Sequence, residues 1–215
     1  MKTKKRTKNR WLWKEVKDKD INTRSCETLF NFFLKAYSEV KLNWNEDWSE
    51  WTKKILGFFA DFGQYYDFCV HCRPQYGVVD STETPTGEYL VDLCWCFEDE
   101  YSRANWIEVA LESELSYPDL DSIKYDFWKL TDIKAFVKIG IFAPKLKDKQ
   151  KVLESLSTLV ASHGIQVPTE KYLIILIINH GPTESPSKQI EIAGYELNYL
   201  GSIREIGSKR FPKTP

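Results

Sequence analysis

Apolar residues recur at helical spacing in two stretches near the start of the chain. The first stretch predicts a helix over residues 24–42, and the second predicts a helix over residues 45–62 with Asn45 as its N-cap. The first stripe consists of Leu29, Phe33, Ala36, Tyr37 and Val40. The second consists of Trp48, Trp51, Ile55, Phe58, Phe59 and Phe62. We interpret both stripes as core packing, because a broad apolar face on a helix is typical of burial against the rest of the domain.

The pattern then changes to alternation with a period of two, which predicts strands. A first strand is expected within residues 65–79, followed by strands over residues 88–97 and 106–115. The second of these strands places Leu90, Asp92, Cys94 and Cys96 on one side. The third places Ile107, Val109 and Leu111 on one face and three carboxylates, those of Glu108, Glu112 and Glu114, on the other.

Helical spacing returns at residues 121–131 and again at residues 147–162. Strands are expected at residues 135–143, 172–179 and 190–200. The segment 172–179 is continuously apolar, which is typical of a strand that is covered on both faces. Three strands in a meander, followed by a helical crossover into a buried strand, predict an α/β fold with a mixed central sheet flanked by helices.

Length and charge suggest one domain with two basic ends. The chain has 215 residues, 42% of them hydrophobic, which excludes wholesale disorder. Its net charge of -1 does not indicate a basic nucleic-acid binder as a whole. We therefore expect a flexible basic tail over residues 1–20, a single α/β domain over residues 21–205 and a basic C-terminal tail over residues 206–215. The N-terminal tail is either solvated or touches phosphates. The phosphate-binding candidates are Lys4, Lys5, Arg6, Lys8 and Arg10.

The sequence predicts a cytoplasmic protein with no membrane segment. Its longest apolar run, residues 172–178, is far shorter than the roughly 20 residues that a spanning helix needs. Five cysteines form an odd number, which does not suggest a disulfide framework. A structural zinc or iron–sulfur site at Cys69, Cys72, Cys94 and Cys96 is not expected, because two of these thiols lie within an alternating strand rather than on turns. We interpret them as buried reduced thiols.

The carboxylates of the third strand have two physical explanations. Glu112 and Glu114 are about 6.6 Å apart along a strand, so their side chains either remain in water or converge on one divalent cation. Asp92 on the preceding strand is a candidate third ligand, because an antiparallel hairpin brings these segments side by side. Hard oxygen ligands favour Mg²⁺ or Mn²⁺.

Asp92 followed by Glu112-Ser113-Glu114 resembles the catalytic signature of the PD-(D/E)xK nuclease superfamily, in its Asp…Glu-x-Glu variant. The order of predicted elements is similar to the αβββαβ core of this restriction-endonuclease-like family. The resemblance implies that Asp92, Glu112, Glu114 and the backbone carbonyl of Ser113 hold Mg²⁺ or Mn²⁺. Glu114 stands where the family has a lysine, which puts the position of the attacking water in doubt.

The resemblance also implies two residues from helices. Some members carry the catalytic lysine on the helix after the motif strand, where this chain has Lys129, which is otherwise an ordinary surface lysine. Glu39 on the first helix corresponds to an acid that several members use.

The resemblance implies metal-dependent hydrolysis of phosphodiester bonds. The implied partner is nucleic acid, and DNA is favoured over RNA. A homodimer is compatible with this activity. The alternatives are an inactive nucleic-acid-binding or protein-interaction module on the same fold, and an α/β domain that docks a partner through Trp44, Trp48 and Trp51.

Overall fold

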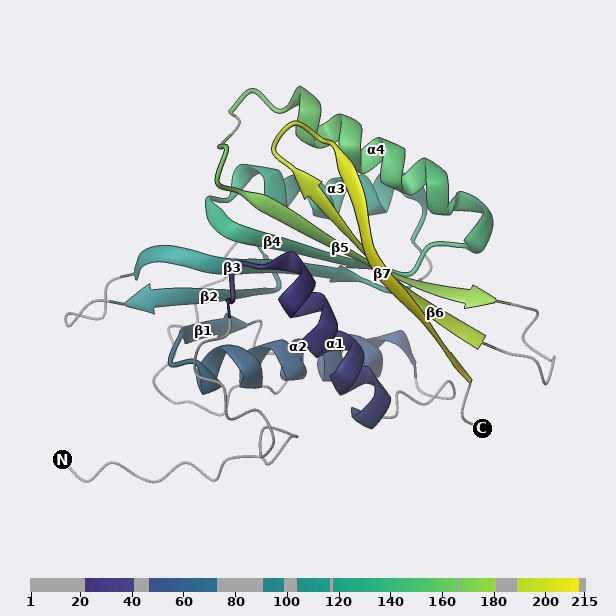
Figure 1. Cartoon of the computed structure of the whole chain (residues 1–215), viewed down its shortest axis with the longest axis horizontal. Coiled ribbons are helices and arrows are strands. Elements are labelled where there is room, and N and C mark those ends of the chain that lie inside the picture. The colour runs from purple at the N-terminus through teal and green to yellow at the C-terminus, as the bar shows by residue number, and fades with distance from the viewer. Residues whose placement is uncertain are drawn as a thin grey trace.

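The chain folds around one mixed sheet that is covered by helices on both faces (Figure 1). The computed structural model describes residues 22–40, 47–72, 91–98, 104–116, 118–165, 167–180 and 189–212. These residues contain four α-helices and a sheet of seven strands. The predicted α/β class with a mixed central sheet is therefore confirmed.

The elements follow one another in an order close to the predicted one. The two N-terminal helices are α1 (Cys26–Val40) and α2 (Trp48–Tyr65). The first three strands are β1 (Cys69–Cys72), β2 (Leu93–Glu98) and β3 (Ala104–Glu114). The crossover region consists of α3 (Leu120–Asp132), β4 (Ala135–Phe142), the short 3₁₀ helix η2 (Leu146–Asp148) and α4 (Lys149–Ser162). The chain ends with β5 (Lys171–His180), β6 (Gln189–Asn198) and β7 (Ile203–Pro212).

The seven strands lie side by side in the order in which they occur along the chain. β1, β2 and β3 form an antiparallel meander, β3, β4 and β5 run parallel, and β5, β6 and β7 are antiparallel again. Parallel neighbours need a crossover, and α3 and α4 supply the two crossovers. Both helices lie on the same face of the sheet, opposite α1 and α2 (Figure 1).

The face under α1 and α2 holds an aromatic core centred on Trp95 of β2. Its indole Nε1 donates a hydrogen bond to the Phe59 carbonyl at 3.0 Å, and its ring packs against Phe62 and Phe68. Gly63 allows this approach, because a Cβ at that position would lie 2.5 Å from the indole nitrogen. Trp51 is also buried here, so it is not available to dock a partner. Trp44 lies outside the described residues.

The opposite face packs α3 and α4 against the side chains that alternate with that core. Ile123, Phe127 and Leu130 of α3 belong to the core on this face. The Phe127 ring packs near those of Phe142 of β4 and Tyr172 of β5. α3 begins after Asp119, whose side chain accepts a hydrogen bond from the Ser122 amide at 2.8 Å and so caps the helix. The same capping arrangement starts α2, but at Asp47. The predicted cap, Asn45, lies outside the described residues.

One predicted tail is part of the sheet. β7 covers Ile203–Pro212, so residues expected as a basic C-terminal tail over 206–215 largely form an edge strand paired with β6. Most β7 side chains are exposed, and the strand carries charges such as Arg204, Glu205 and Arg210. Charged exposed edges of this kind lack the alternation that identifies a strand, and they discourage pairing with other chains.

A β-bulge separates Glu108 from the other carboxylates of β3. Val109 pairs with Trp95 of β2, whereas Ile107 pairs with the next residue, Cys96, so Glu108 is the extra residue. Val109 lies in the core under α1 and α2, and Ile107 packs against the core under α3 and α4. The prediction that Ile107 and Val109 share a face with Glu108 opposite is therefore wrong.

Candidate functional site

Asp92, the residue before β2, lies level with Glu112 of the neighbouring strand β3. Leu93 pairs with Leu111 in the β2–β3 ladder, which places the preceding Asp92 beside Glu112. The Asp92 carboxylate accepts a hydrogen bond from the backbone amide of Ser113 at 2.9 Å. Both acids are almost fully buried, with 4% and 2% of their surfaces exposed. The hairpin predicted from the sequence therefore brings these two residues together, although each exposes very little surface.

Lys129 of α3 reaches the same place from above the sheet. Its Nζ lies 3.4 Å from Oε2 of Glu112 and 2.6 Å from Oδ1 of Asp126, one helical turn earlier. α3 packs over β3 and β4, so a side chain from the second half of the helix reaches β3. The lysine that the family resemblance places on this helix is thus in contact with the motif acid. Asp126, which holds the lysine, is an additional member of the group and is visible in sequence as an i, i+3 pair.

The positive charge of Lys129 does not fully compensate for the burial of Glu112 beside Asp92. Burial, and then the charge of Asp92, raise the pKa of Glu112 to about 8, and Lys129 only partly opposes this shift. Burial lowers the pKa of Lys129, but its hydrogen bond to Asp126 and the charge of Glu112 outweigh burial, so the net shift is upward. Oε1 of Glu112 has no hydrogen-bond partner in the described part of the chain. A buried carboxylate oxygen without a donor is unfavourable unless a proton or a cation occupies that position.

Glu114 does not join Asp92 and Glu112. It is the last residue of β3, and its carboxylate accepts hydrogen bonds from the amide and the hydroxyl of Ser116 in the following turn. It is also not among the charges that shift the pKa of Glu112. The strand ends where the alternation would have directed Glu114 toward the site, and the turn supplies donors in its place.

Other predicted site residues lie elsewhere or are not described. Glu108 contacts the segment before α1, where Thr23 donates a hydrogen bond to it at 2.9 Å and Arg24 forms an ion pair at 2.9 Å. Glu39 lies in α1, but its side chain is outside the described residues. The basic candidates Lys4, Lys5, Arg6, Lys8 and Arg10 are outside them as well.

A second buried charged group was not predicted. Lys138 of β4 is fully buried, and its Nζ forms an ion pair with Glu170 and lies 3.2 Å from the Tyr172 hydroxyl. Burial lowers the pKa of Lys138, and the contact with Glu170 opposes that shift. The sequence signal was a single charge within the apolar segment 135–143. Lys138 is offset by two residues from the position opposite Glu112 in the β3–β4 register, since Ala110 pairs with Lys138 and Glu112 pairs with Gly140.

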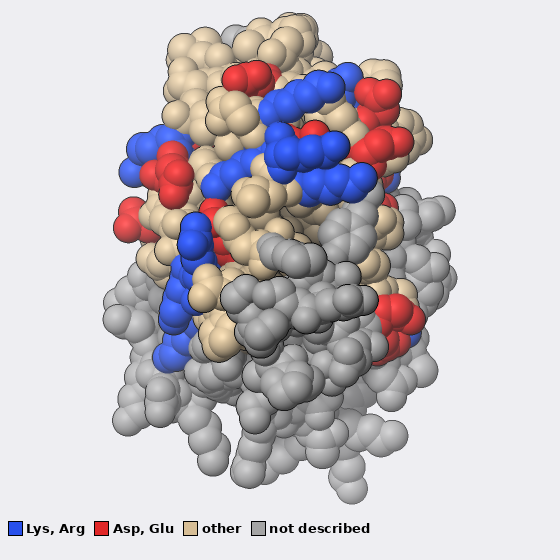
Figure 2. All heavy atoms as spheres, turned by 90° about the vertical axis from the view of Figure 1, so that its right-hand side faces the viewer, with Lys and Arg blue, Asp and Glu red and all other residues tan. Residues whose placement is uncertain are grey.

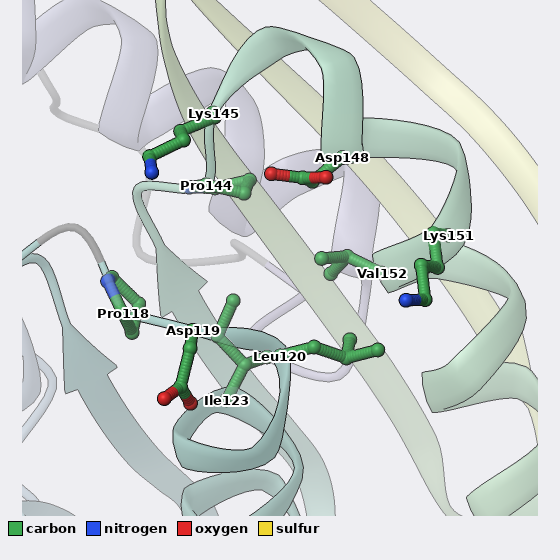
Figure 3. Close-up of a pocket in the computed structure, with 9 residues that line it drawn as sticks. All are labelled: Pro118, Asp119, Leu120, Ile123, Pro144, Lys145, Asp148, Lys151 and Val152. Carbon is green, nitrogen blue, oxygen red and sulfur yellow. The ribbon is translucent and has the colours of Figure 1, made fainter.

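A cavity of about 250 Å³ lies where β3 and β4 end (Figure 3). The segment after β3 contributes Pro118, Asp119, Leu120 and Ile123. The segment after β4 contributes Pro144, Lys145, Asp148, Lys151 and Val152. Two lysines and two aspartates balance one another in formal charge, and neither Asp92 nor Glu112 lines the cavity. This cavity is therefore separate from the acidic group.

The end of the molecule where β5 finishes carries mixed charge (Figure 2). Glu191 of β6 is at the centre of one group, with Lys149 Nζ at 2.7 Å, His180 Nε2 at 2.8 Å and Arg210 Nε at 3.6 Å. Lysine and arginine side chains gather on this surface, with acidic side chains among them (Figure 2). The mixture does not form a uniform basic track for a nucleic acid.

The described ranges contain neither a ready-made metal cluster nor a membrane-spanning helix. No three His, Cys, Asp or Glu side chains there stand close enough together to hold an ion as they are. No helix there has the length and apolar character that crossing a bilayer requires. Comparisons with family models, with curated proteins and with solved structures found no match to this chain.

Proposed function

We propose that this chain hydrolyses phosphodiester bonds of nucleic acid, DNA before RNA, with the help of a divalent cation at Asp92 and Glu112. The single observation that supports the proposal best is the meeting of Asp92, which directly precedes β2, with Glu112 of β3 and Lys129 of α3. These are the residues that the PD-(D/E)xK resemblance selects, and the αβββαβ order of elements agrees with a restriction-endonuclease-like core.

The residues present fit a Mg²⁺ or Mn²⁺ ion. Such ions are commonly held through one or two carboxylates, with water and substrate phosphates completing the coordination, so a three-residue cage is not required. Oε1 of Glu112 lacks a partner among the described residues and is available as a ligand. Asp92 and the carbonyl of Ser113 are the further candidates. When bound, the ion would lower the pKa of its water and neutralise charge that develops on the phosphate.

The residues of the chain itself have distinct roles in this proposal. The Ser113 amide fixes the Asp92 carboxylate in place, since it donates to Oδ2. Asp126 holds Lys129 in its charged form beside Glu112. A lysine ammonium at this position can hydrogen-bond to the attacking water and to a phosphate oxygen, the task that the missing motif lysine would otherwise perform. The turn after β3 binds Glu114, so Lys129 is the better candidate for this role.

The burial of the acids supports one rival function. A phosphodiester has to reach the ion, yet Asp92 and Glu112 expose only 4% and 2% of their surfaces. An inactive nucleic-acid-binding or protein-interaction module on the same fold would keep the buried Lys129–Glu112 contact and perform no chemistry. The two functions differ in whether the acids are needed for turnover.

Incubation with supercoiled plasmid and with short single strands in Mg²⁺, Mn²⁺ or EDTA separates them. We expect cleavage in either metal and none in EDTA. Asp92→Asn and Glu112→Gln should abolish cleavage, whereas Glu108→Gln, which alters an equally buried acid of β3, should keep it. Binding without cleavage in any metal would favour the inactive module. Equal activity in Asp92→Asn and the wild type would contradict the assignment of the site.

A further inference from the structure

Two pairs of metal-ligating side chains face each other across the β1–β2 ladder. Cys69 pairs with Cys96 and His71 pairs with Cys94, so the four residues occupy a two-by-two block on adjacent antiparallel strands. Val70 and Trp95, which alternate with them, point into the core under α1 and α2. Cys94 and Cys96 point to the opposite face, and Cys69 packs there as well. Three thiols and one imidazole therefore share one face.

The separations within each pair match those of neighbouring ligands on a tetrahedral zinc ion. Zn–S bonds of about 2.3 Å and Zn–N bonds of about 2.0 Å at tetrahedral angles place two sulfurs about 3.8 Å apart, and a sulfur and a nitrogen about 3.5 Å apart. Sγ of Cys94 and Sγ of Cys96 are 3.7 Å apart. Sγ of Cys69 and Nε2 of His71 are 3.5 Å apart. Side chains at i and i+2 of a strand start about 6.6 Å apart, so each pair has converged.

We propose that Cys69, His71, Cys94 and Cys96 bind one Zn²⁺ ion. Among the described residues no three of these side chains surround one point, so binding requires the two pairs to turn toward each other, for example by rotation about the Cα–Cβ bonds of Cys69 and His71. Three soft sulfur ligands with one imidazole select zinc over Mg²⁺ or Mn²⁺. Each thiol loses its proton on binding, so the ion replaces S–H contacts with Zn–S bonds. The site is distinct from the carboxylates of Asp92 and Glu112 and does not depend on the proposed hydrolysis.

The position of the site explains what the ion would do. Among the described residues β1 comprises four residues and lies at the edge of the sheet, paired with β2 (Figure 1). So short an edge strand gains little from ladder hydrogen bonds alone. A zinc ion bound by two residues of β1 and two of β2 fastens the edge to the sheet. Structural zinc sites stabilise small elements in this way.

Cys72 provides a matched control within the same strand. It follows His71 directly, pairs with Leu93 and packs with the core under α1 and α2, so its thiol lies on the other face of the ladder. The sequence grouped Cys72 with the other three thiols, and the structure substitutes His71 for it. A zinc site of the kind proposed needs His71 and does not need Cys72.

The test measures zinc per chain by mass spectrometry of metals, after the full chain is purified with reduced thiols and supplied with Zn²⁺. We expect about one ion per chain in the wild type, in Cys72→Ser and in Glu112→Gln, and almost none in Cys96→Ser and His71→Ala. Retention of zinc in Cys96→Ser, equal loss in Cys72→Ser, or loss in Glu112→Gln would overturn the assignment. Absence of zinc from the wild type, with free thiols or a disulfide instead, would overturn the site altogether.

A second measurement needs no variant and holds if the substitutions unfold the protein. Co²⁺ added to the zinc-free wild type should give the intense ligand-field and thiolate charge-transfer absorption of a tetrahedral sulfur site, and Zn²⁺ should displace it. X-ray absorption should then fit three sulfur ligands and one nitrogen ligand. A six-coordinate, oxygen-rich spectrum would place the cobalt at the carboxylates and overturn the proposal. Activity on nucleic acid has no part in either readout.

Discussion

Glu112 should make the metal-free protein less stable as pH rises. Its pKa is raised from 4.5 to about 8 in the folded chain, by burial first and by Asp92 second. Between these two values the folded state binds more protons than the unfolded state, so the free energy of unfolding falls with increasing pH. One pKa unit corresponds to about 1.36 kcal/mol, so the full loss is at most about 5 kcal/mol. It is complete above the folded pKa and absent below pH 4.5.

The assay is urea unfolding in EDTA at several pH values from 5 to 9, followed by the fluorescence of buried tryptophans such as Trp51 and Trp95. Glu112→Gln removes the titrating group, so the free energy of unfolding of this variant should fall much less between pH 5 and pH 9 than that of the wild type. The charged groups that act on Glu112 are Asp92, Asp126 and Lys129, and all of them remain in the variant. Asp61 of α2, whose pKa burial raises to about 6, contributes to both proteins. The difference between wild type and variant therefore isolates Glu112.

A divalent cation provides the internal control. Mg²⁺ or Mn²⁺ should restore stability to the wild type at pH 8 and should have little effect on Glu112→Gln, because the ion favours the charged carboxylate. If the free energy of unfolding of the two proteins depended on pH in the same way, the raised pKa of Glu112 would be refuted. Oε1 of Glu112, which has no hydrogen-bond partner among the described residues, would then no longer support a metal site.

Three further outcomes follow from the described contacts. Lys129→Gln should lower the rate of cleavage by about 10²-fold with little change in Mn²⁺ affinity, measured by single-turnover kinetics and calorimetry. Lys138→Met should lower the free energy of unfolding by about 3 to 5 kcal/mol, because it leaves Glu170 buried without a partner, and adding Glu170→Leu should recover much of that loss in urea unfolding. Gly63→Ala should cost about 1 to 3 kcal/mol in the same assay, since its Cβ would overlap the Trp95 indole, and an unchanged midpoint would contradict the packing described for that face.

The regular elements could be predicted because their buried apolar residues recur with the period of a strand or of a helix. The continuous apolar segment expected at residues 172–179 is β5, which has neighbours on both sides and helices on both faces. The helix expected at residues 121–131 is α3, extended by one residue at each end. In both elements the apolar residues that form the pattern are the ones buried in the core, so the sequence alone is sufficient to predict the element.

The departures have local causes that a one-dimensional pattern does not contain. The bulge at Glu108 reverses which face its neighbours occupy, because one extra residue shifts the pleat. β7 was not predicted because most of its side chains are exposed and only a few, such as Ile206 and Phe211, pack against the core, so its sequence does not alternate regularly. Glu114 fits the acidic motif by spacing, yet the turn donors of Ser116 bind it. Spacing predicts which residues share a strand, whereas the partners at the strand ends depend on the fold.

The site was predictable to the same limited extent. Asp92 and Glu112 follow from a hairpin, and Lys129 follows from the family resemblance, since spacing alone does not link a helix to a strand. The block formed by Cys69, His71, Cys94 and Cys96 required the register between β1 and β2. The sequence grouped Cys69 with Cys72, whereas the ladder places Cys69 and His71 opposite Cys96 and Cys94.

Calorimetric titration of Mn²⁺ into the wild type, Asp92→Asn and Glu112→Gln tests the central claim most directly. We expect one Mn²⁺ site in the wild type, and affinity reduced by about tenfold or more in each variant, because each removes one of two carboxylate ligands. Equal Mn²⁺ affinity in all three proteins, or no binding to the wild type, would contradict it.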